Sequence, residues 1–260
     1  MKPVSVAAVA ASLMAALPIS TALVAHPPAT TGSKSYGETL IAQVRQRDAH
    51  VIAISISVRG KDGENIVVGS AGKPGRHIVS APIANSMGEP IGTISVRFDR
   101  RGGSAARIAQ HLGRRIYVSE NLRDPDPFVA GTARTRQAQA IVERMIDHHP
   151  DLVTLAMHIA PPGSENIILA SNFGRIGTRA DKDDMHVIND GAVLREVTNG
   201  GKRLAVELPQ LDRSGKVIGA LSTSFTVTAS QSAEQAYAKA IALRDEIARA
   251  TPSLEALTAR

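Results

Sequence analysis

The chain has 260 residues, no cysteine and only 3% aromatic residues, and its formal net charge at pH 7 is +6. The lack of cysteine excludes a disulfide scaffold and thiol chemistry. A positive charge can indicate nucleic-acid binding, but here the basic residues are scattered among 24 acidic ones, and few aromatic rings are available to stack on bases. We therefore expect a basic soluble surface and no nucleic-acid partner.

The first predicted element is a secretory signal peptide at residues 1–25. Lys2 supplies a positive start, residues 4–24 form an apolar run interrupted by Pro18, and small residues allow cleavage after Ala22 or Ala25. The alternative is an uncleaved membrane anchor, since about 20 apolar residues can just span a bilayer. Pro18 and the small residues favour cleavage. We expect a periplasmic or secreted protein of net charge +5, attached to a membrane only if the segment is retained.

The remainder of the chain contains an internal repeat. Residues 40–71 align with residues 141–172 at an offset of 101, and residues 82–98 align with residues 209–225 at an offset of 127. The clearest echo is ENIVVGS in the first copy and ENIILAS in the second. The difference between the offsets is an insertion of 26 residues in the second copy, between about residues 177 and 202.

Each copy is predicted to open with an amphipathic helix and a strand. Apolar residues at helical spacing are Leu40, Ile41 and Val44 in the first copy, and Ala138, Ile141, Val142, Met145 and Ile146 in the second. Alternating apolar residues then predict a strand, with Ile52, Ile54, Ile56 and Val58 on one face, or Val153, Leu155, Met157 and Ile159. The Glu-Asn-Ile segment follows a turn at residues 60–63 or 161–163.

The second half of each copy reads as a strand hairpin and a closing helix. The hairpin turns at residues 85–88 or 212–215. The helices are predicted from Ala105, Ile108, Ala109, Leu112 and Ile116, and from Ala233, Ala236, Ala240, Leu243 and Ile247. The link at residues 121–133, which holds Pro125, Pro127 and Gly131, should be extended. Short strands with tight turns favour antiparallel pairing. The predicted fold class is α+β, with two tandem domains at residues 34–122 and 133–260, each an antiparallel sheet flanked by helices.

The insertion is predicted to form a helix and an extra strand. Asp181 is a good N-cap, Asp183 and Asp184 would lie in the first turn, and Gly191 would end the helix. Residues 192–198 would form the strand, before a turn at residues 199–201. The first copy has only residues 72–79 at this place, too few for both elements. The second copy is therefore the predicted binder, and the first a degenerate or structural partner.

Several short motifs occur in order along the second copy. They are Ala-Ser-Asn at residues 170–172, Arg175-Ile176-Gly177, Asp181, Asp184, Val187-Ile188, Gly191, Leu208-Pro209, Asp212, Gly215 and Ile218-Gly219-Ala220. This series resembles extracytoplasmic PAS-like sensor domains of the Cache (PDC) type, over about residues 136–249 and in reduced form in the first copy. The resemblance implies a curved antiparallel sheet that cups a small ligand, often a carboxylate, amine or amino acid, beneath loops and short helices.

Such domains usually feed a membrane-embedded kinase or chemoreceptor. This chain departs from that pattern, because it has no second hydrophobic segment and no cytoplasmic output module. A freestanding binding protein, or a partner of an envelope or membrane protein, is therefore expected.

Five residues are predicted to contact the ligand: Asn172, Arg175, His158, Asp184 and Arg203. Asn172 ends the Glu-Asn-Ile strand, and the arginines offer a planar fork for carboxylate or phosphate. His158 lies on the face of its strand opposite the apolar stripe. The alternatives are ordinary ones: Asn172 caps a turn, the arginines are exposed, and His158 faces solvent or makes a structural hydrogen bond.

Catalytic, metal and cofactor sites are not predicted. Asp181, Asp183, Asp184 and His186 could bind a divalent ion, but their spacing matches no calcium loop and helix capping accounts for the carboxylates. The chain lacks Gly-x-Ser-x-Gly, P-loop and His-Glu-x-x-His motifs. The sequence predicts an exported, sensor-type protein that binds a small polar metabolite without catalysis. The alternative is an envelope interaction or scaffold protein with vestigial pockets.

Overall fold

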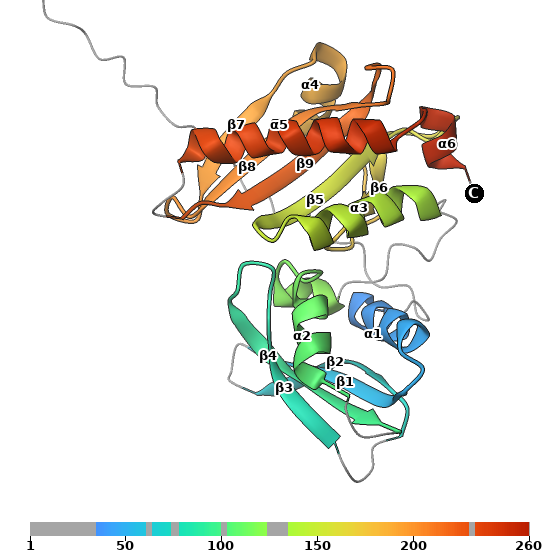
Figure 1. The fold of residues 1–260 in the computed structure, drawn as a ribbon, viewed down its shortest axis with the longest axis vertical. Helices are drawn as coiled ribbons and strands as arrows, with labels where there is room; N and C mark the ends of the chain where they lie inside the picture. The colour runs from blue at the N-terminus through green and yellow to red at the C-terminus, as the bar shows by residue number, and fades with distance from the viewer. Residues whose placement is uncertain are drawn as a thin grey trace, which may run out of the picture.

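The structure is a computed structural model that describes residues 35–60, 64–73, 78–99, 103–123, 135–228 and 232–259. It contains two antiparallel sheets, each with helices packed on it, and the two units stack through the helices between them (Figure 1). The predicted α+β class is therefore confirmed. The predicted signal peptide at residues 1–25 lies outside the described residues, as does most of the predicted link. Within the described ranges, no helix combines the length and apolar character that crossing a bilayer requires.

The first domain contains a four-stranded sheet. Its elements are α1 (Tyr36–Arg47), β1 (Val51–Arg59), β2 (Asn65–Ala71), β3 (Ile78–Ala84), β4 (Pro90–Phe98), α2 (Ala105–Gly113) and the 3-10 helix η1 (Ser119–Arg123). The strand order is β2-β1-β4-β3, and all neighbours are antiparallel. Both α-helices cover one face of this sheet, where a single apolar core includes Leu40, Ile56, Ile94 and Leu112.

The second domain contains a five-stranded sheet. Its elements are α3 (Arg136–His148), β5 (Leu152–Ile159), β6 (Ile167–Ser171), α4 (Lys182–Asp190), β7 (Leu194–Thr198), β8 (Arg203–Leu211), β9 (Val217–Thr226), α5 (Ala233–Ala250) and α6 (Leu254–Thr258). The strand order is β6-β5-β9-β8-β7, which is the order of the first sheet with β7 added at one edge. A separate core, with Met145, Leu155, Leu221 and Phe225, lies between this sheet and the helices α3 and α5.

Irregularities in the strand pairing support the internal repeat. Register shifts occur between residues 51 and 53 and between residues 152 and 154, and again at residues 56/57 and 157/158, each pair offset by 101. A third pair, at residues 83/84 and 210/211, is offset by 127. The hairpin turns match as well, because Asn85 and Asp212 each accept hydrogen bonds from the backbone N–H groups two and four residues later. The two domains thus share both topology and local detail.

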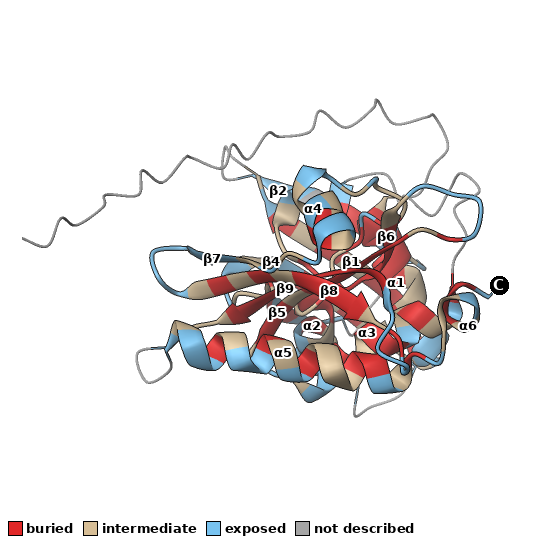
Figure 2. Ribbon diagram, turned by 90° about the horizontal axis from the view of Figure 1, so that it is seen from above, coloured by how far each residue is buried: buried red, intermediate tan, exposed pale blue. Residues whose placement is uncertain are grey.

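The insertion forms the elements that the sequence predicts. Asp181 and Asp184 make a reciprocal capping box at the start of α4, and Gly191 ends the helix in a left-handed conformation with φ 67°. The inserted strand is β7, which pairs with β8. Helix α4 packs on β8 and β9, on the face of the sheet opposite α3 and α5 (Figure 2). This second face is called the α4 face below.

Three details of the predicted elements are wrong. The register shift in β1 turns Ile52 outward, so that it is 37% exposed, and brings Val51 into the core in its place. Helix α2 ends at Gly113, so buried Ile116 lies beyond it. Asn121 belongs to η1 and not to an extended link. The short helix α6 was not predicted.

Candidate functional site

The capping box at the start of α4 places one carboxylate over the sheet. Asp181 accepts hydrogen bonds from the backbone N–H groups of Asp183 at 2.9 Å and Asp184 at 3.1 Å, and the Asp184 carboxylate accepts from the Asp181 N–H at 2.9 Å. Because α4 packs on β8 and β9, Asp184 is only 4% exposed. A residue predicted from the sequence to contact ligand is therefore held rigidly against the α4 face.

His158, Asp184 and Ser222 form a buried polar cluster on the α4 face. His158 Nδ1 lies 3.0 Å from Asp184 Oδ2, and both side chains are less than 10% exposed. Ser222 Oγ lies 3.2 Å from His158 Nε2 and donates to Asp184 Oδ1 at 3.2 Å. Since the hydroxyl donates its proton to Asp184, it accepts the hydrogen bond from His158 Nε2–H. The structure thus brings together two predicted site residues, His158 and Asp184.

The charge state of Asp184 is set by its neighbours. Burial raises the pKa of its carboxyl, but the imidazole of His158, the N–H of Asp181 and the hydroxyl of Ser222 outweigh this effect and bring the pKa below its ordinary value. Asp184 is therefore a carboxylate at neutral pH. A carboxylate and a histidine so close together form an ion pair whenever the histidine is protonated.

Glu207 lies beside this cluster. It is directly opposite Ser222 in the pairing of β8 with β9, so both side chains point to the α4 face. Its Oε2 is buried and, in the part of the chain that the structure describes, has no hydrogen-bond partner. Burial, together with the charges of Asp184, Asp181 and Asp183, raises the pKa of Glu207 to about 8. At pH 7 this residue is therefore mostly a neutral carboxylic acid, which can donate a hydrogen bond.

The distances in the cluster resemble those of a hydrolytic Ser-His-Asp triad, but the directions of its hydrogen bonds differ. A triad needs the serine proton on the histidine side and an N–H of the same imidazole aimed at the aspartate. Here the Ser222 proton points to Asp184, and His158 Nδ1 makes no hydrogen bond of good geometry despite its short distance to Asp184. The arrangement favours polar binding over nucleophilic catalysis.

The floor of the α4 face is lined by small side chains. Thr154 and Ala156 on β5 pair with Ser224 and Ser222 on β9, and Ala205 on β8 pairs with Ser224. Thr154 and Ser224 are joined by a hydrogen bond of 2.6 Å between their hydroxyls. Beside β5, a small apolar group of Ala156, Ile168 and Ile176, with Phe173 against it, borders this floor. The face therefore has a centre of small, mostly polar side chains and an apolar margin.

Asn172, another predicted site residue, lies elsewhere and is 3% exposed. Its carbonyl oxygen accepts from the Leu155 N–H at 2.8 Å, and its amide nitrogen donates to the carbonyls of Val153 at 3.0 Å and Arg114 at 2.8 Å. Leu155 and Val153 belong to β5, whereas Arg114 belongs to the first domain. The geometry gives Asn172 a structural role at the boundary between the domains.

The two predicted arginines do not join the cluster. Arg175 is exposed, in a loop where it has the left-handed φ of 60°. Arg203, at the start of β8, donates from Nε to Thr198 Oγ1 at 2.8 Å and from Nη1 to the hydroxyl of Tyr117 in the first domain. Its guanidinium carbon also lies 5.1 Å from the centroid of the Tyr117 ring. The ligand role expected for these two residues stays a prediction.

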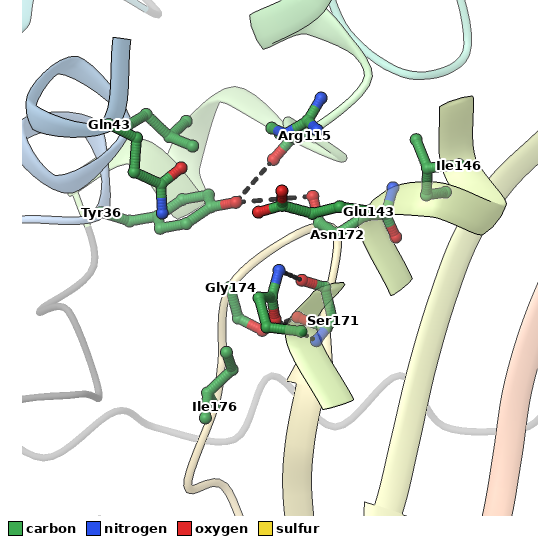
Figure 3. Close-up of a pocket in the computed structure, with 11 residues that line it drawn as sticks. Tyr36, Gln43, Arg115, Glu143, Ile146, Ser171, Asn172, Gly174 and Ile176 are labelled. Carbon is green, nitrogen blue, oxygen red and sulfur yellow. Dashed lines mark hydrogen bonds between the residues drawn. The ribbon is translucent and has the colours of Figure 1, made fainter. Parts of the chain in front are cut away.

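A small cavity lies between the two domains (Figure 3). Its volume of about 20 Å³ is enough for one water molecule. The Tyr36 hydroxyl donates to the Arg115 carbonyl at 2.9 Å and lies 3.4 Å from the Asn172 carbonyl, and Gln139 donates to the Ser171 carbonyl at 3.0 Å. These bonds make the cavity part of the interface between the domains, and its size excludes a metabolite.

A wider, open hollow of about 480 Å³ lies on the first domain, between α1 and the strands β1 and β2. Its size is in the range of ligand pockets. Its polar lining residues Glu38, Arg45 and Gln46 are exposed on the helix rim and do not converge on a buried centre. The predicted reduced role of the first domain stays a prediction.

Sequence reasoning missed Ser222 and Glu207. Both are on strands whose existence it predicted, and the alternation of β8 already places Glu207 opposite the core residues Leu204, Val206 and Leu208. What it lacked was the register between β5, β9 and β8. That register, read from the paired repeats, is the signal that could have placed Ser222 beside His158.

No family model matches the chain, and no curated protein matches it. Among solved structures, the chain is similar to the C-terminal part of PelD from Pseudomonas aeruginosa in complex with c-di-GMP, with 12% identity over 88% of this chain and 83% of that chain and a TM-score of 0.25. It is also similar to the inducer-binding domain of a double mutant of the transcription factor PobR from Acinetobacter in complex with 3-hydroxybenzoic acid, with 12% identity over 82% and 95% and a TM-score of 0.18. TM-scores this low do not establish a common fold, so the site is interpreted from its own geometry.

Proposed function

We propose that this chain is an exported, sensor-type protein that binds a small polar metabolite on the α4 face of its second domain, without catalysing a reaction. The observation that carries the proposal is the cluster of His158, Asp184 and Ser222, which the inserted helix α4 encloses against the sheet in the second domain. Glu207 adds a buried oxygen without a partner among the described residues. A carboxylate, an imidazole, a hydroxyl and a neutral acid provide donors and acceptors for a polar ligand.

The finer identity that we propose is a pair of tandem PAS/Cache-like domains. The supporting observations are the motifs in the second copy, the antiparallel strand order shared by both sheets, and a helix of the insertion lying on the sheet face opposite the core. In this proposal the first domain, which has no counterpart of α4 among its described elements, serves as a structural partner.

A thermal-shift screen against a broad library of small polar metabolites tests the binding function. We expect a saturable rise in Tm with at least one compound, because a ligand that binds only the folded state stabilises it. Asp184→Asn and His158→Ala should each raise the apparent Kd obtained from that shift in Tm at least tenfold. Asp190→Asn is the matched control, since Asp190 is on the same helix but exposed, where it pairs with His186. A library without any saturable shift would contradict the proposal.

Export is tested separately. Expression of the full chain in a host with a secretion system should yield a periplasmic or secreted product whose intact mass corresponds to cleavage after Ala22 or Ala25. A product that retains Met1 to Ala25 and sediments with membranes would show an uncleaved anchor in place of a signal peptide.

One observation favours the second candidate, an envelope interaction or scaffold protein. Ser222 contacts both His158 Nε2 and Asp184 Oδ1, so part of the cluster is closed on itself, as expected if an ancestral pocket has closed. In that case an envelope partner, which a library of small metabolites does not contain, would bind Asp184→Asn and the wild-type chain equally well. Equal pull-down by both chains, combined with an empty metabolite screen, would select this function.

A further inference from the structure

One short segment of the first domain, residues 114–117, contacts three different segments of the second through Arg114 and Tyr117. The Arg114 carbonyl accepts from Asn172 Nδ2 at 2.8 Å, and the Arg114 guanidinium donates to the His149 carbonyl, just before β5, at 2.8 Å. Tyr117 accepts from Arg203, the first residue of β8. This short segment therefore reaches the end of β6, the approach to β5 and the start of β8, and it is called the docking segment below.

Tyr117 contacts residues at the margin of the α4 face. Its ring lies under the guanidinium of Arg203, and its centroid is 6.4 Å from that of Phe173, with a tilt of 55° between the planes. Phe173 in turn packs against Ala156 and Ile176, which border the small-residue floor. Aromatic and cation–π contacts of this kind add to the stability of the contact between the domains. The first domain thus supplies a side chain to the margin of the second domain's site.

The docking segment is also fixed within its own domain. The Ser86 N–H donates to the Ile116 carbonyl at 2.8 Å, and Asn85 Nδ2 donates to the Tyr117 carbonyl at 3.1 Å. Both donors belong to the β3–β4 hairpin turn, so the segment is tied to the first sheet at one side and to the second domain at the other. A displacement of the first domain must therefore pull on Asn172, His149 and Arg203 together.

The same strands carry the candidate site. His158 is on β5, Glu207 is on β8, and the Asn172 side chain joins the start of β5 to the end of β6 through Leu155 and Val153. The same strands therefore make the contacts at the domain boundary and carry residues of the candidate site. Asn172 and Arg203, which were selected from the sequence as ligand contacts, are the residues of the second domain that bind Arg114 and Tyr117 of the docking segment.

We propose that the first domain regulates the candidate site through the docking segment: docking holds β5, β6 and β8 in place, and with them His158 on β5, Glu207 on β8 and the part of the sheet at β8 on which α4 packs, and undocking loosens this arrangement. By linkage, a ligand that tightens the site must favour docking by the same factor. The inference rests on the proposed function only for what the site binds, because docking and local opening can both be measured without ligand.

The first measurement is the distance between the domains. Because the chain has no cysteine, Ala106→Cys on α2 and Ala238→Cys on α5, both exposed, allow one spin label in each domain. Pulsed electron paramagnetic resonance should give a narrow distance distribution in the otherwise unaltered chain. Tyr117→Ala and Arg203→Gln, which break one contact from its two sides, should each broaden it. Tyr117→Phe, which keeps the ring and loses the hydroxyl, should have a smaller effect.

The second measurement is hydrogen exchange on the same chains. In Tyr117→Ala and Arg203→Gln, the amides of α4 and the Leu155 amide should exchange at least tenfold faster, while those in the cores of β4 and α2 keep their rates. Arg203→Gln leaves the first domain's sequence intact, so it decides the matter if Tyr117→Ala unfolds that domain.

Two results would overturn the inference. One is a narrow distance distribution in Arg203→Gln, and the other is a broadened one with unchanged exchange in α4. A metabolite screen without any saturable shift would contradict the proposed function, but the distance and hydrogen-exchange measurements would still test this inference.

Discussion

At the scale of single residues, the most informative group is Glu207. Its side chain is on the α4 face between Asp184 on one side and Glu196 on the neighbouring strand, and burial with these like charges raises its pKa to about 8. An unfolded glutamate loses its proton near pH 4.5. Between these pH values the folded chain holds a proton that the unfolded chain has released. Stability from Glu207 is therefore fully present below pH 4.5 and is lost as the pH rises through 8.

The direction of this dependence of stability on pH leads to a prediction for Glu207→Gln. The amide cannot ionise, so the variant should match the wild type in free energy of unfolding at pH 5 and exceed it by about 1–2 kcal/mol at pH 9, a figure discounted for partial solvent screening. Urea unfolding at pH 5, 7 and 9 measures the difference. Glu64→Gln, which removes an exposed acid just before β2 in the first domain, is the control and should show little pH dependence of its own. Equal stabilities at pH 9 would contradict the assigned burial.

Asn172 gives a second prediction at this scale. Asn172→Ala removes two buried hydrogen bonds and one partly buried hydrogen bond, and it leaves the Leu155 N–H and the Val153 carbonyl without their partner. Unsatisfied buried groups are costly, so we expect a loss of about 2–4 kcal/mol in free energy of unfolding, measured without ligand. Asn172→Asp, which keeps the acceptor for Leu155 but turns a charged oxygen toward the Val153 and Arg114 carbonyls, should lose at least as much. A ligand-dependent effect without any loss of stability would instead support the direct binding role expected from the sequence.

At the scale of elements, the repeat makes a paired prediction. Gly92 on β4 and Gly219 on β9 occupy matching positions, and a Cβ on either would lie 2.0 Å from the Ser57 carbonyl oxygen or 2.2 Å from that of His158. Neither backbone oxygen can move without disturbing its sheet. Gly92→Ala and Gly219→Ala should each cost about 1–3 kcal/mol, whereas Thr93→Ala, next to Gly92 and exposed, should cost much less. Denaturant unfolding of the three variants provides the comparison, and a tolerated alanine at only one of the glycines would argue against equivalent strands.

The elements were largely predictable because their causes are local. The apolar spacing of α3, the caps of α4 at Asp181 and Gly191, and the echo of β2 in β6 are all contained within a few residues. The exposed position of Ile52 was not predictable, because it depends on a register shift between β1 and β4 that alternation alone cannot reveal.

The site was predictable only in part. His158 and Asp184 were selected from the face of a strand and the cap of a helix, but their contact depends on how α4 packs, which is a tertiary property. Asn172 and Arg203 were selected for their polar chemistry, and the structure uses that chemistry between the domains. A single sequence shows which side chains can bind a polar group and cannot show whether that group is a ligand or another part of the chain.

At the scale of the whole molecule, oppositely charged side chains add to the contacts that the docking segment makes between the two domains. Arg47, His111 and Arg115 of the first domain face Glu143 and Asp147 on α3 of the second, with an ion pair between Arg47 and Glu143. Burial, together with the charge of Arg115 and Arg47, lowers the pKa of His111 to about 4. His111 is therefore neutral at pH 7, and its ring nitrogens lie beside both guanidinium groups.

A double-mutant cycle on the free energy of unfolding measures how much these charged side chains contribute to holding the two domains together. Arg47→Ala and Glu143→Ala should show a coupling energy of about 0.2–1 kcal/mol at low salt, because the Arg47 side chain is 48% exposed and water screens the pair. In 1 M NaCl the coupling should approach zero. A large coupling that persists in salt would mean that charge, and not the docking segment, holds the domains together. The control cycle pairs Arg195 and Glu234, an exposed ion pair within the second domain.

The added strand β7 distinguishes the two sheets in one more respect. It covers the outer edge of β8, pairing residues 194–198 with residues 203–207 and stopping two residues before Pro209. In the first sheet β3 stands at the corresponding edge, with Ile78 and Val79 nearly half exposed and Pro82 as its guard against further pairing. The first sheet therefore has the edge strand that is more prone to pair with another chain, and we expect aggregation of partly unfolded chains to begin at β3.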